Sequence, residues 1–229
     1  MSYRPLIAIS FLFFCLSILN PVHTLPWIGF FSEASAFIGI LLLLPLLFNR
    51  QLKVPKITIP FVFFSTLPLL QYSLGQIFFF SNASLSIIYI FSFWLAILIG
   101  YNFSLKETKS QLSFNFKNFL AWFLFVSGVF SALFALLQWL NLSNHIPVIM
   151  ELVGYRPYAN MAQPNHLGTL LNLALFSSCY LYGKGKLKLP ILVIIFIFLT
   201  FAMALTQSRT GYLIFLSTLI FVFLFNNKL

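Results

Sequence analysis

The sequence contains very little charge and no aspartate. Of its 229 residues, 13 are Lys or Arg and 3 are Asp or Glu, and together they make up 7% of the chain. A soluble domain carries roughly 25% charged residues. Hydrophobic residues account for 61% of the chain, and Phe alone occurs 31 times. This composition excludes a soluble globular protein, a disordered chain and, despite a net charge of +10, a nucleic-acid binder.

The apolar residues form continuous runs, which predicts an all-α, polytopic integral membrane protein. A bilayer core of about 30 Å requires about 20 apolar residues per helix. The runs do not alternate with a period of two, which excludes an outer-membrane barrel. We expect a single transmembrane domain over residues 1–229, and its eight predicted transmembrane helices are about 5–22, 27–48, 57–75, 84–103, 115–140, 166–183, 190–206 and 212–226. The first is interpreted as a retained helix, because no small-residue cleavage site follows it.

The two cysteines and the remaining polar residues give no sign of a cofactor. Cys15 and Cys179 lie inside predicted helices, which indicates packing positions and says nothing about disulfides. No cluster of His, Cys or acidic residues has metal-ligand spacing, so no metal is expected. His23 and His145 are expected to be residues of the membrane interface.

The basic residues are distributed unevenly over the loops. With a cytoplasmic N-terminus, the inward segments hold Arg4, Arg50, Lys53, Lys56, Lys106, Lys109, Lys117, Lys184, Lys186, Lys188 and Lys228. The outward segments hold only Arg156 and Arg209. Such a split over short loops follows the positive-inside rule and predicts that both termini are cytoplasmic. The net charge is therefore a topology signal, and the two outward arginines need another explanation.

The longest outward segment runs from about residue 141 to 165. Pro164 disfavours helix at Gln163 and suits the first helical position, which places Asn165 and His166 in the first turn of the sixth helix. The unpaired N–H groups of such a turn attract anions. Because Arg156 lies eight residues upstream, we expect a phosphate or carboxylate site here. The alternative is that Arg156 and the neighbouring tyrosines simply lie among the lipid headgroups.

Arg209 and Glu33 are charged residues close to or inside predicted helices. Arg209 is predicted at the turn between the last two helices, at or slightly below the outer surface. A charge at that depth is costly, so it indicates either a partner or a snorkelling arginine capped by its own turn. Glu33 is the only carboxylate inside a predicted helix, roughly 9 Å beneath the surface marked by Trp27. We expect it to face a polar cavity or to pair with Arg156 or Arg209, and the sequence does not choose between these.

The polar motifs on the outward side occur in a fixed order, separated by one helix hairpin. They are Asn20-Pro21-Val22-His23, Pro26-Trp27, Phe31 and Glu33, then Tyr155-Arg156 with Gln163-Pro164-Asn165-His166-Leu167-Gly168, and finally Thr206-Gln207-Ser208-Arg209-Thr210-Gly211. In this order and spacing they resemble the bacterial O-antigen ligase and polymerase superfamily. The resemblance is greatest to its protein O-oligosaccharyltransferase (pilin glycosylation ligase) branch.

The resemblance implies a glycosyltransferase of the bacterial inner membrane that needs no metal. Such an enzyme moves a glycan from an undecaprenyl-diphosphate carrier to a periplasmic acceptor, either a protein Ser or Thr hydroxyl or lipid A core. It implies that Arg156 and Arg209 hold the diphosphate, which agrees with the bidentate, permanent charge of arginine. With the residue arguments above, Asn165, His166 and Glu33 complete the predicted substrate-binding set. The expected partners are the lipid-linked donor, the acceptor and membrane lipids.

The sequence departs from the resembling family at its end. Members usually have about twelve helices, with the histidine proposed as general base in a large later periplasmic loop. The resemblance therefore implies an N-terminal portion of a larger ligase that lacks its catalytic base and is inactive alone. His166 matches the Gln-Pro-Asn-His motif and not that later histidine, so no catalytic residue is assigned. Two other functions stay open: a transporter or flippase for an anionic lipid-linked substrate, and a structural membrane subunit.

Overall fold

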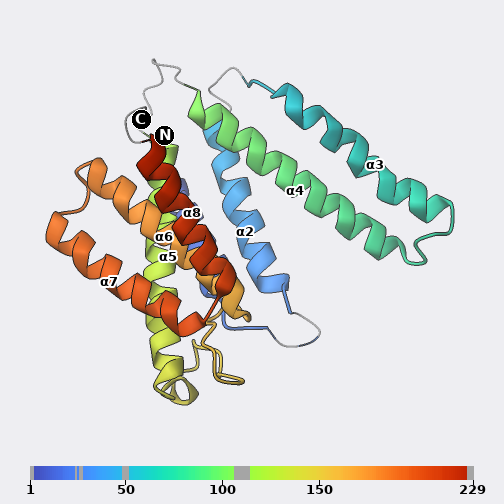
Figure 1. Ribbon diagram of the computed structural model, residues 1–229. Coiled ribbons are helices and arrows are strands. Elements are labelled where there is room, and N and C mark those ends of the chain that lie inside the picture. The colour runs from blue at the N-terminus through green and yellow to red at the C-terminus, as the bar shows by residue number, and fades with distance from the viewer. Residues whose placement is uncertain (1–2, 24, 26–27, 48–51, 106–113, 226–229) are drawn as a thin grey trace. The chain divides into compact units, whose positions relative to one another are not determined.

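The computed structural model describes residues 3–23, 25, 28–47, 52–105 and 114–225 (Figure 1). None of these residues forms a β-strand. Their α-helices are α1 (Arg4–Leu19), α2 (Phe30–Leu43), α3 (Ile59–Ser73), α4 (Phe80–Ser104), α5 (Phe116–Trp139), α6 (Pro164–Gly183), α7 (Leu189–Thr206) and α8 (Arg209–Phe225). Three short 3₁₀ helices are η1 (Leu44–Leu47), η2 (Lys56–Thr58) and η3 (Ser143–His145). The all-α class is confirmed, and each predicted helix overlaps one of these α-helices. Several residues of the sequence argument lie outside the described residues: Pro26, Trp27, Arg50, Lys106, Lys109 and Lys228.

Four helical segments of the described residues are long and apolar enough to cross a membrane. They are Phe30–Leu47, Phe80–Ser104, Phe116–Trp139 and Leu189–Thr206. The apolar stretches Arg4–Leu19 and Arg209–Ile220 are shorter, and α3 has only 15 residues, with Pro68 inside it. α6 has 20 residues but carries polar side chains such as Asn172. By length and composition, four of the eight expected crossings are therefore present, and the other four stay predictions.

The chain divides into two compact units, the first comprising residues 1–13 and 36–117. In this unit α3 and α4 lie side by side (Figure 1). Buried polar side chains are satisfied by backbone groups: Ser10 Oγ donates to the Gly39 carbonyl at 2.8 Å. The Asn102 side chain forms a reciprocal pair with Lys53, because Nδ2 donates to its carbonyl and Oδ1 accepts from its N–H, both at 2.9 Å. These hydrogen bonds satisfy polar groups that would otherwise be buried without a partner.

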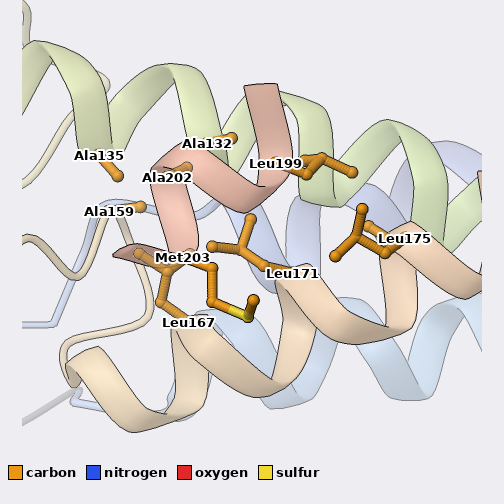
Figure 2. Close-up of a cluster of buried hydrophobic side chains, with 10 residues drawn as sticks. Ala132, Ala135, Ala159, Leu167, Leu171, Leu175, Leu199, Ala202 and Met203 are labelled. Carbon is orange, nitrogen blue, oxygen red and sulfur yellow. The ribbon is translucent and has the colours of Figure 1, made fainter. Parts of the chain in front are cut away.

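The second unit comprises residues 14–35 and 118–229, and α6 is its central helix. α7 and α8 both contact α6. A Cβ at Gly128 of α5 would overlap Cβ of Ala174, so glycine permits close approach of α5 and α6. The core between α5, α6 and α7 is formed by Ala132, Ala135, Ala159, Leu167, Leu171, Ala174, Leu175, Leu199, Ala202 and Met203 (Figure 2). Neighbouring helices cover one face of α6. The polar residues on that face, such as Asn172, are therefore not exposed to lipid.

Candidate anion-binding site

The start of α6 forms as the sequence predicts. Gln163 has an extended backbone (φ −149°, ψ 130°), and Pro164 is the first residue of the helix. Pro has no N–H to leave unpaired and its fixed φ fits the first helical position. Asn165 and His166 therefore lie in the first turn, where Asn165 is half-buried and His166 is exposed. The N–H groups of this turn have no partner within the helix.

The turn between α7 and α8 places Arg209 at a second helix start. Gln207 ends α7 with a left-handed backbone (φ 50°). The buried Ser208 is the N-cap of α8, since its Oγ accepts from the N–H of Gly211 at 3.1 Å. Arg209 is the first residue of α8 and its side chain is exposed. A cation gains nothing from the positive end of the helix dipole, so Arg209 does not serve to cap this helix.

Two glycines bring the starts of α6 and α8 together. A Cβ at Gly168 would lie 3.0 Å from Cβ of Ser208 and 3.6 Å from Cα of Gly211. One turn further into α6, the buried Asn172 donates from Nδ2 to the carbonyls of Gly168 and Gly211, at 2.9 Å each. The glycines of the two motifs therefore serve close helix contact, and two helix N-termini lie next to each other.

Arg156 links the outward segment to both helix ends. Its Nε donates to the Thr206 carbonyl at 2.9 Å, and Nη2 donates to the Gln207 carbonyl at 3.2 Å. Nη2 also lies 3.4 Å from Oδ1 of Asn165, a long hydrogen bond. The guanidinium thus lies over the first turn of α6 and reaches the turn that precedes Arg209. Within the described part of the chain Nη1 donates no hydrogen bond, which leaves that nitrogen available to a ligand.

A buried glutamine at the end of α5 shapes the outward segment. The Gln138 side chain is fully buried, and its Nε2 donates to the carbonyls of Met150 and Ala159 at 2.9 Å each. Its Oε1 accepts from the N–H groups of Tyr158, at 3.0 Å, and Ala159, at 2.7 Å. One side chain therefore satisfies four backbone groups and fixes the chain immediately after Arg156.

A second buried amide, Asn160, connects the same segment to the first helical hairpin. Its Nδ2 donates to the carbonyls of Leu19, at 2.7 Å, and Val148, at 2.8 Å, and its Oδ1 accepts from the Met150 N–H at 3.0 Å. The ring Nε2 of His23 donates to the Asn160 carbonyl at 2.9 Å. His23 is thus a structural link between two loops.

Glu33 lies in the first turn of α2, where a negative charge is favourable. Its side chain is exposed, and its carboxylate folds back towards Gly29. The hydrogen bonds of Arg156 go to Thr206, Gln207 and Asn165, so among the described residues Glu33 is not its partner. The structure therefore joins Arg156, Asn165 and the turn before Arg209, and Glu33 stays a separate prediction.

Sequence reasoning missed the two buried amides that hold the site. Gln138 had one signal, because it is a polar residue near the end of a mostly apolar helix. Asn160 had none, since an asparagine in an outward loop is ordinary. Ser208 was recognised only as part of a motif, although Ser followed by a helical run is a typical N-cap signal.

The assembled groups are suited to an oxyanion. Two helix starts supply N–H donors, and the guanidinium of Arg156 and the exposed Arg209 supply charge. No group of three or more His, Cys, Asp or Glu side chains that could hold a metal occurs in the described residues. Charge compensation by arginine and backbone donors is the chemistry that Arg156, Arg209 and the two helix starts provide.

Comparison with known proteins supports the resemblance drawn from the motifs. The protein glycosylation ligase family matches residues 157–182, which include the start of α6. The chain is 38% identical to a general O-oligosaccharyltransferase of Acinetobacter baylyi (strain ATCC 33305 / BD413 / ADP1), over 85% of this chain and 34% of that protein. It is 27% identical to a ComP-specific O-oligosaccharyltransferase of the same strain, over 87% of this chain and 36% of the relative. The chain thus spans about a third of the length of these relatives. No solved structure matches it.

Proposed function

We propose that this chain, which is similar to O-oligosaccharyltransferases over most of its length, takes part in glycan transfer to a protein. The donor would be an oligosaccharide on an undecaprenyl-diphosphate carrier, and the acceptor a periplasmic Ser or Thr hydroxyl. The observation that carries this proposal is the guanidinium of Arg156, which lies over the start of α6 and holds the turn that precedes Arg209.

The proposed reaction forms a bond between the acceptor oxygen and the anomeric carbon of the first sugar. The bond between that carbon and the diphosphate oxygen breaks, the acceptor proton goes to a base, and the diphosphate leaves with its carrier. Negative charge grows on the leaving diphosphate, which Arg156, Arg209 and the first-turn N–H groups would stabilise. Arg156 is suited to this role because protein carbonyls anchor its Nε and Nη2 atoms, while Nη1 remains available to bind the diphosphate.

The proposal includes a placement in the bacterial inner membrane. We propose eight membrane crossings within a single transmembrane domain, with both termini in the cytoplasm and a periplasmic segment at about 141–165. The distribution of basic residues supports this orientation. The short helices α1, α3 and α8 and the polar helix α6 complete the eight crossings if they are covered by neighbouring helices or lie at a slight bilayer thinning.

The test measures donor binding by the 229-residue chain, reconstituted in lipid nanodiscs. Arg156→Ala and Arg209→Ala should each weaken binding of undecaprenyl diphosphate about ten- to hundredfold, because a charge-assisted hydrogen bond is worth roughly 1.5–3 kcal/mol. Lys186→Ala is the matched control, since it removes an exposed cation beyond the opposite end of α6 and should leave binding within about twofold. Normal binding by both arginine variants would overturn the diphosphate assignment.

Transfer itself is measured as glycosylation in a host that makes the donor and acceptor but lacks its own ligase. In a version of the protein that transfers glycan, the arginine variants should lose transfer in parallel with donor binding. If the parent protein binds the donor and exports the lipid-linked substrate but forms no glycosylated product, the transporter function would be indicated instead.

A further inference from the structure

A pocket of about 360 Å³ opens beside Arg156 in the outward segment. Its lining residues are Met150, Val153, Gly154, Tyr155, Arg156, Tyr158, Ala162 and Pro164. Ligand sites in proteins measure roughly 300–1,000 Å³, so this pocket is at the lower end of that range. This volume is sufficient for a sugar bound in an open pocket.

The wall of this pocket is held in place by hydrogen bonds that a ligand need not supply. The hydroxyl of the buried Tyr158 donates to the Glu151 carbonyl at 2.6 Å and accepts from the Val153 N–H at 3.0 Å. Gln138 fixes the backbone on the other side of Arg156 through the N–H of Tyr158. The pocket is therefore formed before a ligand binds, which lowers the entropic cost of binding.

Tyr155 is a lining residue whose aromatic side chain is largely exposed. It is 76% exposed, and it follows Gly154, whose backbone is left-handed (φ 96°) and where a Cβ would meet no described atom within 4 Å. Glycine at such a φ turns the chain so that the next side chain can project outwards. An exposed aromatic ring next to a cationic residue suits a phosphorylated sugar, because the apolar face of a sugar can pack on the ring and the phosphate can pair with the cation.

We propose that this pocket binds the first sugar of the lipid-linked donor, with the ring of Tyr155 packed against that sugar. This rests on the proposed function, in which Arg156 holds the diphosphate. The first sugar is bonded directly to the diphosphate, so it lies beside whichever residue binds the phosphate. In an in-line displacement the acceptor hydroxyl approaches the anomeric carbon from the side opposite the diphosphate. A pocket that adjoins Arg156 is therefore on the donor side of the reaction and not on the acceptor side.

The experiment measures the affinity of the 229-residue chain in nanodiscs for two probes. One is undecaprenyl diphosphate without sugar, and the other is the glycan-bearing donor isolated from the native host. Tyr155→Ala should weaken binding of the glycan-bearing donor about five- to thirtyfold and binding of the sugarless carrier by less than about twofold, because one sugar-stacking contact is lost. Tyr155→Trp keeps a stacking face and should retain donor binding within about threefold. Arg156→Ala should weaken both probes.

Two controls keep the outcomes distinct. Tyr182→Ala removes another exposed tyrosine, near the far end of α6, and should change neither affinity. Melting temperatures of the Tyr155 variants should match the parent, since the ring is largely exposed. Equal weakening of both probes by Tyr155→Ala, or of neither, overturns the sugar pocket. A parent protein that binds sugarless undecaprenyl diphosphate no better than undecaprenol refutes the underlying function instead.

Discussion

Nε of Arg156 donates to the carbonyl of Thr206 across 2.9 Å, which fastens the outward segment to the last turn of α7. Carbonyls at a helix C-terminus have no partner within the helix and carry partial negative charge. The contact is therefore favourable without any ligand, and Arg156 has a structural role as well as the proposed binding role. Arg209 differs, because its side chain is exposed at a helix start and donates no hydrogen bond to the described residues.

This difference predicts that the two arginines separate in a stability measurement. Arg156→Ala removes up to three hydrogen bonds and should lower the free energy of unfolding by about 1–3 kcal/mol. Arg209→Ala should leave the free energy of unfolding within about 0.5 kcal/mol of the parent, as expected for an exposed side chain. Thermal unfolding in detergent micelles gives both values. An equal loss of stability in the two variants would mean that Arg209 also has a structural partner.

The contact between α6 and α8 predicts a cost for any side chain at Gly168. In Gly168→Ala the new Cβ lies 3.0 Å from Cβ of Ser208, which belongs to the buried cap of α8 and has little room to move. Overpacking of this kind costs about 1–3 kcal/mol. The variant should unfold at a lower temperature and should also bind donor less tightly, since both helix starts shift.

Gly183→Ala is the matched control for that substitution. Gly183 is the last residue of α6, and a Cβ added there would meet no described atom within 4 Å. The same chemical change there should be neutral, or slightly stabilising because alanine favours helix. If Gly183→Ala were as destabilising as Gly168→Ala, close packing would not be the cause.

Gln138 predicts the largest structural effect in the outward segment. Gln138→Leu keeps a similar volume but leaves the N–H groups of Tyr158 and Ala159 and the carbonyls of Met150 and Ala159 without partners. Each unsatisfied buried group costs roughly 1–3 kcal/mol, reduced where the segment opens to water. We expect loss of protease resistance between residues 150 and 160 in limited proteolysis. Gln71→Leu, at an exposed position of α3, should leave the digestion pattern unchanged.

These residues also show which features of the site follow from the sequence. The start of α6 was predictable because Pro164 imposes a local restriction on its own φ and on Gln163. The path of the segment before it was not predictable, because Ala159 (φ 52°) and Ala162 (φ 56°) adopt the left-handed region that sequence rules assign to glycine. Such strain persists only where surrounding contacts impose it, here the amide of Gln138 on Ala159. The four bonds of Gln138 span 12 to 21 residues, and no local pattern encodes a contact of that separation.

The charge distribution predicts the orientation of α6, and cysteine labelling tests it. In a Cys179→Ser background, with Cys15 buried, single cysteines replace Asn144 and Lys186, which are exposed at opposite ends of the second unit. Cysteine at Asn144 should react with a membrane-impermeant maleimide in intact cells, and cysteine at Lys186 only after the membrane is permeabilised. Ser143 is a poorer labelling position than Asn144, because its side chain is 2% exposed and would be protected by burial and not by the membrane.

The reverse labelling pattern would place Arg156 and Arg209 on the cytoplasmic side. The diphosphate proposal would then require transfer at the cytoplasmic face, and the positive-inside explanation of the basic loops would be wrong.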